Sequence, residues 1–164
     1  MIYGNGGICQ IVDVTTMEME GVPKDRLYYV LRPENGTGGT IFTTVENSKV
    51  ALRRIMTKEE VEELLGDMSR METLDIPNEK LRETCYKECM KSCDSRNLVR
   101  MIKTIYLRKK DRTSCGKKTT ATDERYLKLA EDSLYSEFSL LLGIPKGKVV
   151  DYISEKIKNS EKNI

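Results

Sequence analysis

The chain has 164 residues, of which 33% are charged and 38% are apolar, and it contains no Trp and no His. This length fits one domain or two small ones, whose cores have to rest on aliphatic side chains, Met and Tyr. The sequence contains no apolar run long enough to cross a membrane and no paired-carboxylate or nucleophile motif. We therefore expect a non-enzymatic cytoplasmic protein without a cofactor.

The net charge of +2 is distributed unevenly along the chain. Residues 1–76 contain 8 Lys and Arg against 13 Asp and Glu, a net charge of −5, whereas residues 77–164 contain 20 against 13, a net charge of +7. The window 100–128 alone holds 10 basic and 3 acidic residues. This asymmetry predicts different partners for the two halves, a protein for the acidic half and nucleic acid for the basic half.

The first 50 residues alternate turn sequences with short runs of β-branched and aromatic residues, which is typical of strands. The predicted strands cover residues 8–14, 27–32 and 40–45, and residues 49–53 add a short fourth. Gly-rich turns join them into a small barrel or a curled antiparallel sheet. A sheet of this size has little to bury by itself, so we expect it to pack on a helix or a partner.

A capping box marks the first helix. In the run Thr57-Lys58-Glu59-Glu60, the side chains of Thr57 and Glu60 can each accept a hydrogen bond from the other's backbone amide, which predicts a helix over 58–66. The following segment, 67–77, ends in Pro and coincides with the change in charge. We assign residues 1–56 to a β module, 57–76 to a helix and linker, and 77–164 to a basic helical domain.

Beyond this linker the apolar residues recur with the period of a helix. They predict helices over 78–92, 96–111 and 123–142, with Gly143 closing the third and Pro145 opening a last one. The predicted fold class is α+β, with a small antiparallel β-sheet followed by an all-α domain of about four to five helices.

Three of the five cysteines, Cys85, Cys89 and Cys93, recur at every fourth position of one predicted helix. Three ligands along a straight helix span about 12 Å, which is too far for one metal ion. We interpret these cysteines as small core residues in a stripe that Leu81 begins. A thiol-based metal or redox sensor is the alternative hypothesis.

Cations gather around one connection between predicted helices. Arg108, Lys109, Arg125 and Lys128 are candidates for contact with the phosphates of DNA. Few aromatic residues lie among them, so we expect backbone contacts more than base readout or stacking. A solvated charged face is the alternative interpretation.

Phe42 lies among threonines in the predicted strand 40–45. Such a strand is either an internal strand of a barrel or an edge that offers unpaired backbone groups to a partner strand. The sequence leaves both interpretations open.

Several motifs, taken in order, point to a known family. In the N-terminal half they are Ile2-Tyr3-Gly4, Gly7-Ile8-Cys9-Gln10-Ile11, Tyr28-Tyr29-Val30-Leu31, Thr40-Ile41-Phe42-Thr43-Thr44 and Val50-Ala51-Leu52-Arg53. In the C-terminal half they are Leu107-Arg108-Lys109-Lys110 and Asp123-Glu124-Arg125-Tyr126-Leu127. Together these motifs resemble the CarD/CdnL family of bacterial transcription regulators, over nearly the whole chain.

The resemblance implies a Tudor-like β module that grips the β subunit of RNA polymerase. Its candidate polymerase-binding residues here are Met17, Thr40, Phe42 and Thr44. The resemblance also implies that the helical domain lies against promoter DNA and stabilises the open complex. A polymerase-bound adaptor that makes no contact with DNA is the alternative.

Two departures from the family pattern affect these expectations. Family members usually begin with a strand that precedes the Tyr-Gly turn, and this sequence lacks that strand. We therefore expect an open sheet edge through which the chain can self-associate. They also carry a Trp wedge where this chain has Glu79. A carboxylate does not wedge between bases and repels phosphate, so DNA contact is expected to rest on cations such as Arg82, Arg125 and Lys128.

Overall fold

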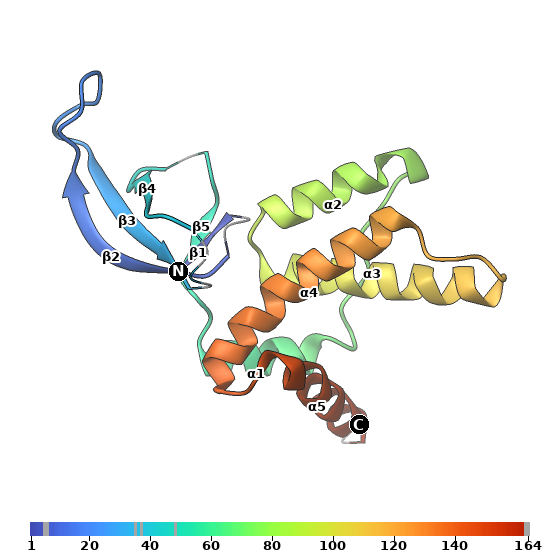
Figure 1. The fold of residues 1–164 in the computed structure, drawn as a ribbon. Coiled ribbons are helices and arrows are strands. Elements are labelled where there is room, and N and C mark those ends of the chain that lie inside the picture. Colours follow the sequence, from blue (N-terminus) through green and yellow to red (C-terminus); the bar gives the residue numbers. More distant parts are fainter. Residues whose placement is uncertain (5–6, 35, 37, 48, 163–164) are drawn as a thin grey trace. The chain divides into compact units, whose positions relative to one another are not determined.

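The computed structural model describes residues 1–4, 7–34, 36, 38–47 and 49–162 (Figure 1). The chain forms two compact units, Met1–Ile55 and Met56–Ile164. Antiparallel strands make up the first unit and helices the second, so the predicted α+β class is confirmed. Among the described residues, no helix is both long and apolar enough to cross a membrane.

Two small antiparallel sheets build the first unit. Strand β1 (Ile2–Tyr3) pairs with β5 (Leu52–Arg53), and β2 (Cys9–Thr16), β3 (Leu27–Pro33) and β4 (Ile41–Thr44) form a sheet in the order β2-β3-β4. Each of the four predicted strands overlaps an observed one, whereas β1 is too short to leave an alternating pattern in the sequence.

The second unit contains five α-helices within residues 56–162. They are α1 (Lys58–Asp67), α2 (Arg82–Lys91), α3 (Ser95–Ser114), α4 (Ala121–Leu142) and α5 (Val149–Lys162), and short 3₁₀ turns, η2 (Glu79–Leu81) and η3 (Lys146–Lys148), precede α2 and α5. The predicted capping box is confirmed, since the amide of Glu60 donates to Thr57 at 3.2 Å and the amide of Thr57 to Glu60 at 2.8 Å.

Two clusters of buried side chains hold the helices together. In one, Val61 and Leu65 of α1 pack with Phe138 of α4 and Val149 of α5; in the other, Tyr86 joins α2 to α3 and α4. The buried carboxylate of Glu137 also accepts a hydrogen bond from the amide of Met56 at 2.8 Å. The helix α1, at the start of the segment 57–76, therefore packs as part of the helical unit.

The charge asymmetry of the sequence does not follow the two units. Residues 1–55 contain 6 basic and 6 acidic residues and are neutral, while residues 56–164 contain 22 and 20, a net charge of +2. The acidic excess lies on α1 and after it, where Glu62 pairs with Lys156 and Glu63 with Arg96. The N-terminal β unit is therefore not acidic, because the surplus acidic residues belong to the helical unit, where Glu62 and Glu63 pair with cations of that unit.

Replacement of either of two glycines of the helical unit by alanine tests the backbone conformation at that position. Gly143 ends α4 at a φ of +66°, Gly66 lies inside α1, and a Cβ added at either would meet no other atom within 4 Å. Gly143→Ala should lower the free energy of unfolding by about 1 kcal/mol, because the left-handed conformation disfavours a Cβ. Gly66→Ala should raise the free energy of unfolding by about 0.5 kcal/mol, because alanine favours the helical conformation more than glycine does.

Urea unfolding followed by far-UV circular dichroism measures both changes. Shifts of the same sign for the two alanine variants would contradict the backbone conformation described at one of the two sites.

Candidate functional site

Strand β4 is an edge of the three-stranded sheet. It pairs with β3 along one side, and no strand within the described residues pairs with its other side. This observation decides between the two interpretations of residues 40–45 in favour of the edge. A free edge presents unpaired backbone amides and carbonyls to a partner strand.

One face of this edge carries two of the four candidate polymerase-binding side chains. Phe42 lies opposite Val30, and Thr44 lies opposite Tyr28. Because alternate residues of a strand share a face, Phe42 and Thr44 lie on the same face of β4, and the exposed Thr40 directly precedes this strand. Phe42 is 47% exposed, which is high for an aromatic side chain.

Met17 lies directly after the end of β2 and is half-buried. The structure therefore places Phe42 and Thr44 on one face of β4, Thr40 directly before this strand, and Met17 at the end of another strand. All four residues remain predictions as contacts with the polymerase.

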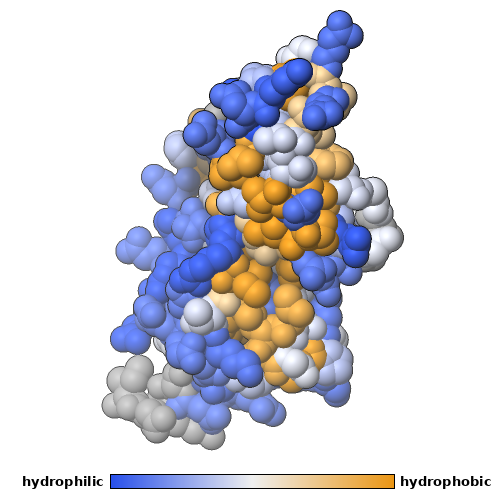
Figure 2. All heavy atoms as spheres, turned by 90° about the vertical axis from the view of Figure 1, so that its left-hand side faces the viewer, coloured by the Kyte–Doolittle hydropathy of each residue, from blue (hydrophilic) through white to orange (hydrophobic). Residues whose placement is uncertain are grey.

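Further apolar surface lies on β2. Figure 2 is viewed from the left-hand side of Figure 1, the side on which β2 lies, and it shows hydrophobic side chains gathered there. Ile11, Val12 and Val14 are each 40% exposed or more. The register shifts between Ile11 and Asp13, so this strand lacks a clean alternation of apolar and polar positions. The small sheet leaves an apolar surface of the kind that marks an interface.

In the helical unit, a buried carboxylate joins three helices. Asp123 of α4 is 1% exposed and lies 3.3 Å from Nε of Arg82 and 3.6 Å from Nε of Arg108. The hydroxyl of Tyr86 donates to the same carboxylate at 3.1 Å. Burial and this negative charge raise the pKa of Tyr86, which keeps its hydroxyl a donor.

Glu79 lies on the solvent side of the same arginines. Arg108 donates to its two oxygens through two nitrogens, at 2.5 and 3.1 Å, and Arg82 donates to one of them. The hydrogen bonds from Arg108 hold the pKa of Glu79 below its ordinary value, so the carboxylate is ionised. We call the set Glu79, Arg82, Arg108 and Asp123 the ion cluster.

The five candidate DNA-binding cations fall into two groups. Arg82 and Arg108 belong to the ion cluster, and Arg125 pairs with Glu83 at 2.8 Å and lies over the ring of Tyr126. Lys109 and Lys128 are exposed, and no ion pair among the described residues involves either. The sequence could not predict this division, because the partners of the three arginines come from other helices or other turns.

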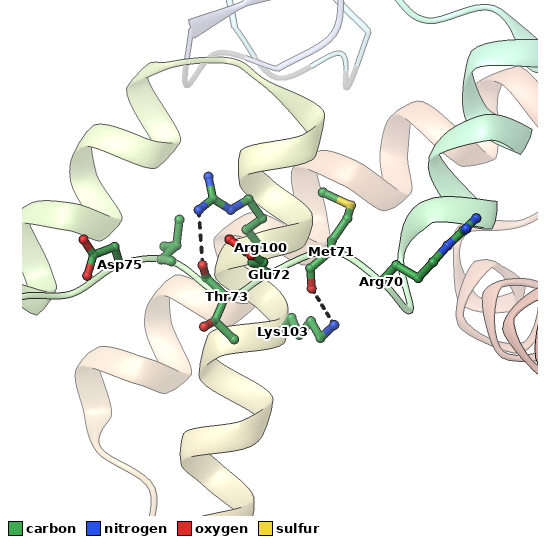
Figure 3. A pocket seen from close by; sticks show the side chains of 8 residues that line it. Arg70, Met71, Glu72, Thr73, Asp75, Arg100 and Lys103 are labelled. Atoms are coloured by element: carbon green, nitrogen blue, oxygen red, sulfur yellow. Dashed lines mark hydrogen bonds between the residues drawn. The ribbon is translucent and has the colours of Figure 1, made fainter.

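A hollow of about 540 Å³ follows the segment between α1 and α2 (Figure 3). It is lined by residues 70–75 together with Arg100 and Lys103 of α3. Arg100 donates to the carbonyl of Thr73 at 3.2 Å, and Lys103 donates to the carbonyl of Met71 at 2.5 Å. These cations hold the segment on α3, so the hollow has a structural explanation.

The three clustered cysteines have different environments. Cys89 is buried on α2 and donates to the carbonyl of Asn97 at 3.0 Å, and burial raises its pKa to about 12. Cys93 is buried beyond the end of α2 at a φ of +55°, and Cys85 is half-buried. Within the described residues, no group of His, Cys, Asp or Glu side chains could hold a metal ion. The core interpretation fits Cys89 and Cys93.

The comparison with known families concerns the β unit. Residues 1–56 match the model of the CarD-like/TRCF RID domain. The first unit is a CarD-like RNA polymerase-interacting domain. Domains of this kind are Tudor-like and serve protein interaction, so the protein is related to transcription and interacts with RNA polymerase.

The match covers about a third of the chain and none of the helical unit beyond Met56. No curated protein matches the chain. What the CarD-like domain establishes therefore applies to β1 to β5, and the role of the helices has to be argued from their own residues.

Outside the CarD-like domain, Asp123 is the residue on which the ion cluster depends. Asp123→Ala should destabilise the helical unit by about 3 kcal/mol, because it leaves two partly buried guanidinium groups without their inner counter-charge. Asp132→Ala on the same helix is the matched control, since it removes an exposed pair with Lys146 at 2.9 Å. This control should cost less than about 1 kcal/mol.

Urea unfolding of the two alanine variants measures both costs. Equal losses of stability would contradict the structural role assigned to the buried carboxylate.

Proposed function

We propose that this protein is a bacterial CarD-like transcription regulator that docks on the β subunit of RNA polymerase through its CarD-like domain. Its helical unit lies beside promoter DNA and modulates the stability of the open complex. The protein acts in the cytoplasm, associated with the nucleoid through the polymerase. The observation that carries this proposal is the family match of residues 1–56 on a unit whose edge strand β4 pairs with no other described strand on its outer side.

The docking surface combines backbone and side-chain recognition. The free edge of β4 supports strand addition, in which main-chain hydrogen bonds give affinity and alternate side chains give specificity. Phe42 supplies an exposed aromatic side chain at this edge, and aromatic anchors commonly dominate the energy of an interface. Thr44 lies on the same face of β4, and Thr40 directly precedes the strand.

The proposed contact with DNA is supported by the exposed lysines. Lys109 lies near the end of α3, before its connection to α4, and Lys128 lies on α4. Both keep a full charge available for backbone phosphates, which are bound without regard to sequence. We expect weak contacts that strengthen when the polymerase holds the helical unit next to the promoter.

No covalent chemistry is needed for this function. Contacts that form only when the promoter is open shift the equilibrium between closed and open complexes toward the open one. A difference of about 1.4 kcal/mol in contact energy changes the ratio of the two states about tenfold. Tethering by the CarD-like domain makes such small differences effective.

A second candidate is a polymerase-bound adaptor whose helical unit contacts protein instead of DNA. It is favoured by the ion pairs of Arg82, Arg108 and Arg125, which reduce the charge available to phosphates. The adaptor keeps the same docking through β4, so binding to DNA separates the two candidates.

Docking is tested with two side chains of equal exposure. Phe42→Ala should weaken binding of the full chain to a purified β-subunit lobe at least about tenfold, because it removes an aromatic anchor. Leu140→Ala, on α4 outside the CarD-like domain and also 47% exposed in the native chain, should change the affinity less than about twofold. Titration by biolayer interferometry measures both.

Absence of binding by the unmodified chain would contradict docking on the β subunit. A loss of affinity confined to Leu140→Ala would place the docking surface on the helical unit instead of β4.

The DNA contact is tested by removing two charges. Lys109→Gln with Lys128→Gln should lower the affinity for a promoter duplex and flatten its dependence on salt, by a slope of about 0.9 for each phosphate that a lysine no longer neutralises. Fluorescence anisotropy over a range of salt concentrations measures this.

Lys58→Gln with Lys91→Gln removes the same charge from other exposed positions of the helical unit and is the control. Equal reductions in affinity for the two double variants would show that the change in net charge explains the effect, without a specific contact of Lys109 or Lys128. No measurable binding by any form of the chain would favour the adaptor.

A further inference from the structure

The carboxylate of Glu79 takes the place of an anion between two guanidinium groups. Arg108 binds both of its oxygens in a forked arrangement, and Arg82 binds one of them. A bidentate guanidinium with a second cation beside it is an arrangement that arginines commonly present to phosphate. The two oxygens of Glu79 therefore lie where two oxygens of a phosphate group could lie.

Asp123 orients this arginine pair from the inner side. Its oxygens lie next to the Nε atoms of Arg82 and Arg108, at 3.3 and 3.6 Å, so the terminal nitrogens remain for an outer anion. The side chains of the two arginines are only 15% and 23% exposed, which limits their freedom to move. Because one buried carboxylate faces two guanidinium groups, the pair retains one positive charge when Glu79 is absent.

Glu79 is a replaceable occupant of this position. Its side chain is 66% exposed, so water can solvate the carboxylate once it leaves the arginines. It belongs to the three-residue turn η2, which Asn78 caps at the start through the amides of Lys80 and Leu81. Rotation of one side chain from this turn is enough to vacate the arginine pair.

We propose that Arg82 and Arg108 form a clamp for a backbone phosphate of nucleic acid, and that Glu79 occupies the clamp as an intramolecular anion that the phosphate displaces. This inference rests on the DNA contact in the proposed function. It assigns to Glu79 a regulatory role. The carboxylate competes with DNA for the clamp in the free chain, so only a phosphate that is already held close to the clamp displaces it.

The variant Glu79→Gln tests the clamp in the full chain. It should raise the affinity for a double-stranded DNA about tenfold at low salt and steepen the salt dependence by a slope of about 0.9, which corresponds to one additional phosphate. Glu88→Gln is the matched control, since it removes the same charge from an exposed position on α2. It should raise the affinity less than about twofold.

Equal gains for Glu79→Gln and Glu88→Gln would overturn the clamp, because net charge would then explain both. A second variant connects the gain to the arginines. Arg108→Gln should reduce DNA affinity more in the Glu79→Gln background than in the unmodified chain. The same reduction in both backgrounds would also overturn the inference.

A measurement without DNA separates the clamp from the proposed function. Inorganic phosphate should shift the NMR signals of the terminal Nη–H groups of Arg82 and Arg108 in Glu79→Gln at lower concentrations than in the unmodified chain. These shifts without any binding to DNA would keep the anion clamp but contradict both its nucleic-acid ligand and the DNA contact. Absence of the shifts in the variant would overturn the clamp itself.

Discussion

The contacts of the buried carboxylate of Asp123 are the interactions on which the helical unit depends most. It lies at the first turn of α4 and contacts Arg82 at the start of α2, Tyr86 one turn further and Arg108 on α3. A carboxylate this buried is tolerated because two guanidinium groups offset its charge and the hydroxyl of Tyr86 donates a hydrogen bond to one of its oxygens. The same contacts fix the guanidinium groups, so a stabilising feature also shapes the surface that faces solvent.

Ion pairing in the folded helical unit also limits how much of the chain's positive charge is available at its surface. Counting charges along the sequence suggests an acidic half and a basic half, but the folded units have net charges of 0 and +2. Glu62, Glu63 and Asp67 of α1 pair with Lys156 and Arg96, which lie far along the chain. Because folding brings opposite charges together, the potential of the helical unit depends on exposed lysines such as those at the end of α3 more than on the total charge.

Local signals predicted the secondary structure well. The Thr57 capping box, the left-handed Gly143 and the stripes of apolar residues act over a few positions, so the sequence shows them directly. The candidate site was less predictable, since the partners of Arg82 and Arg108 depend on how α2, α3 and α4 pack. The Cys stripe was predictable only in part, because α2 ends at Lys91 and leaves Cys93 beyond it.

The two units contribute different kinds of recognition. The CarD-like domain offers a free strand edge and exposed apolar side chains, which favour a lasting contact with a folded protein. The helical unit offers lysines and an arginine pair already occupied by Glu79, which favour a weak and salt-sensitive contact. A weak contact suits a regulator of promoter opening, because a ligand shifts an equilibrium only by the difference in its affinity for the two states. In the proposed function, firm attachment through β4 and replaceable contacts at the helices are therefore consistent parts of one mechanism.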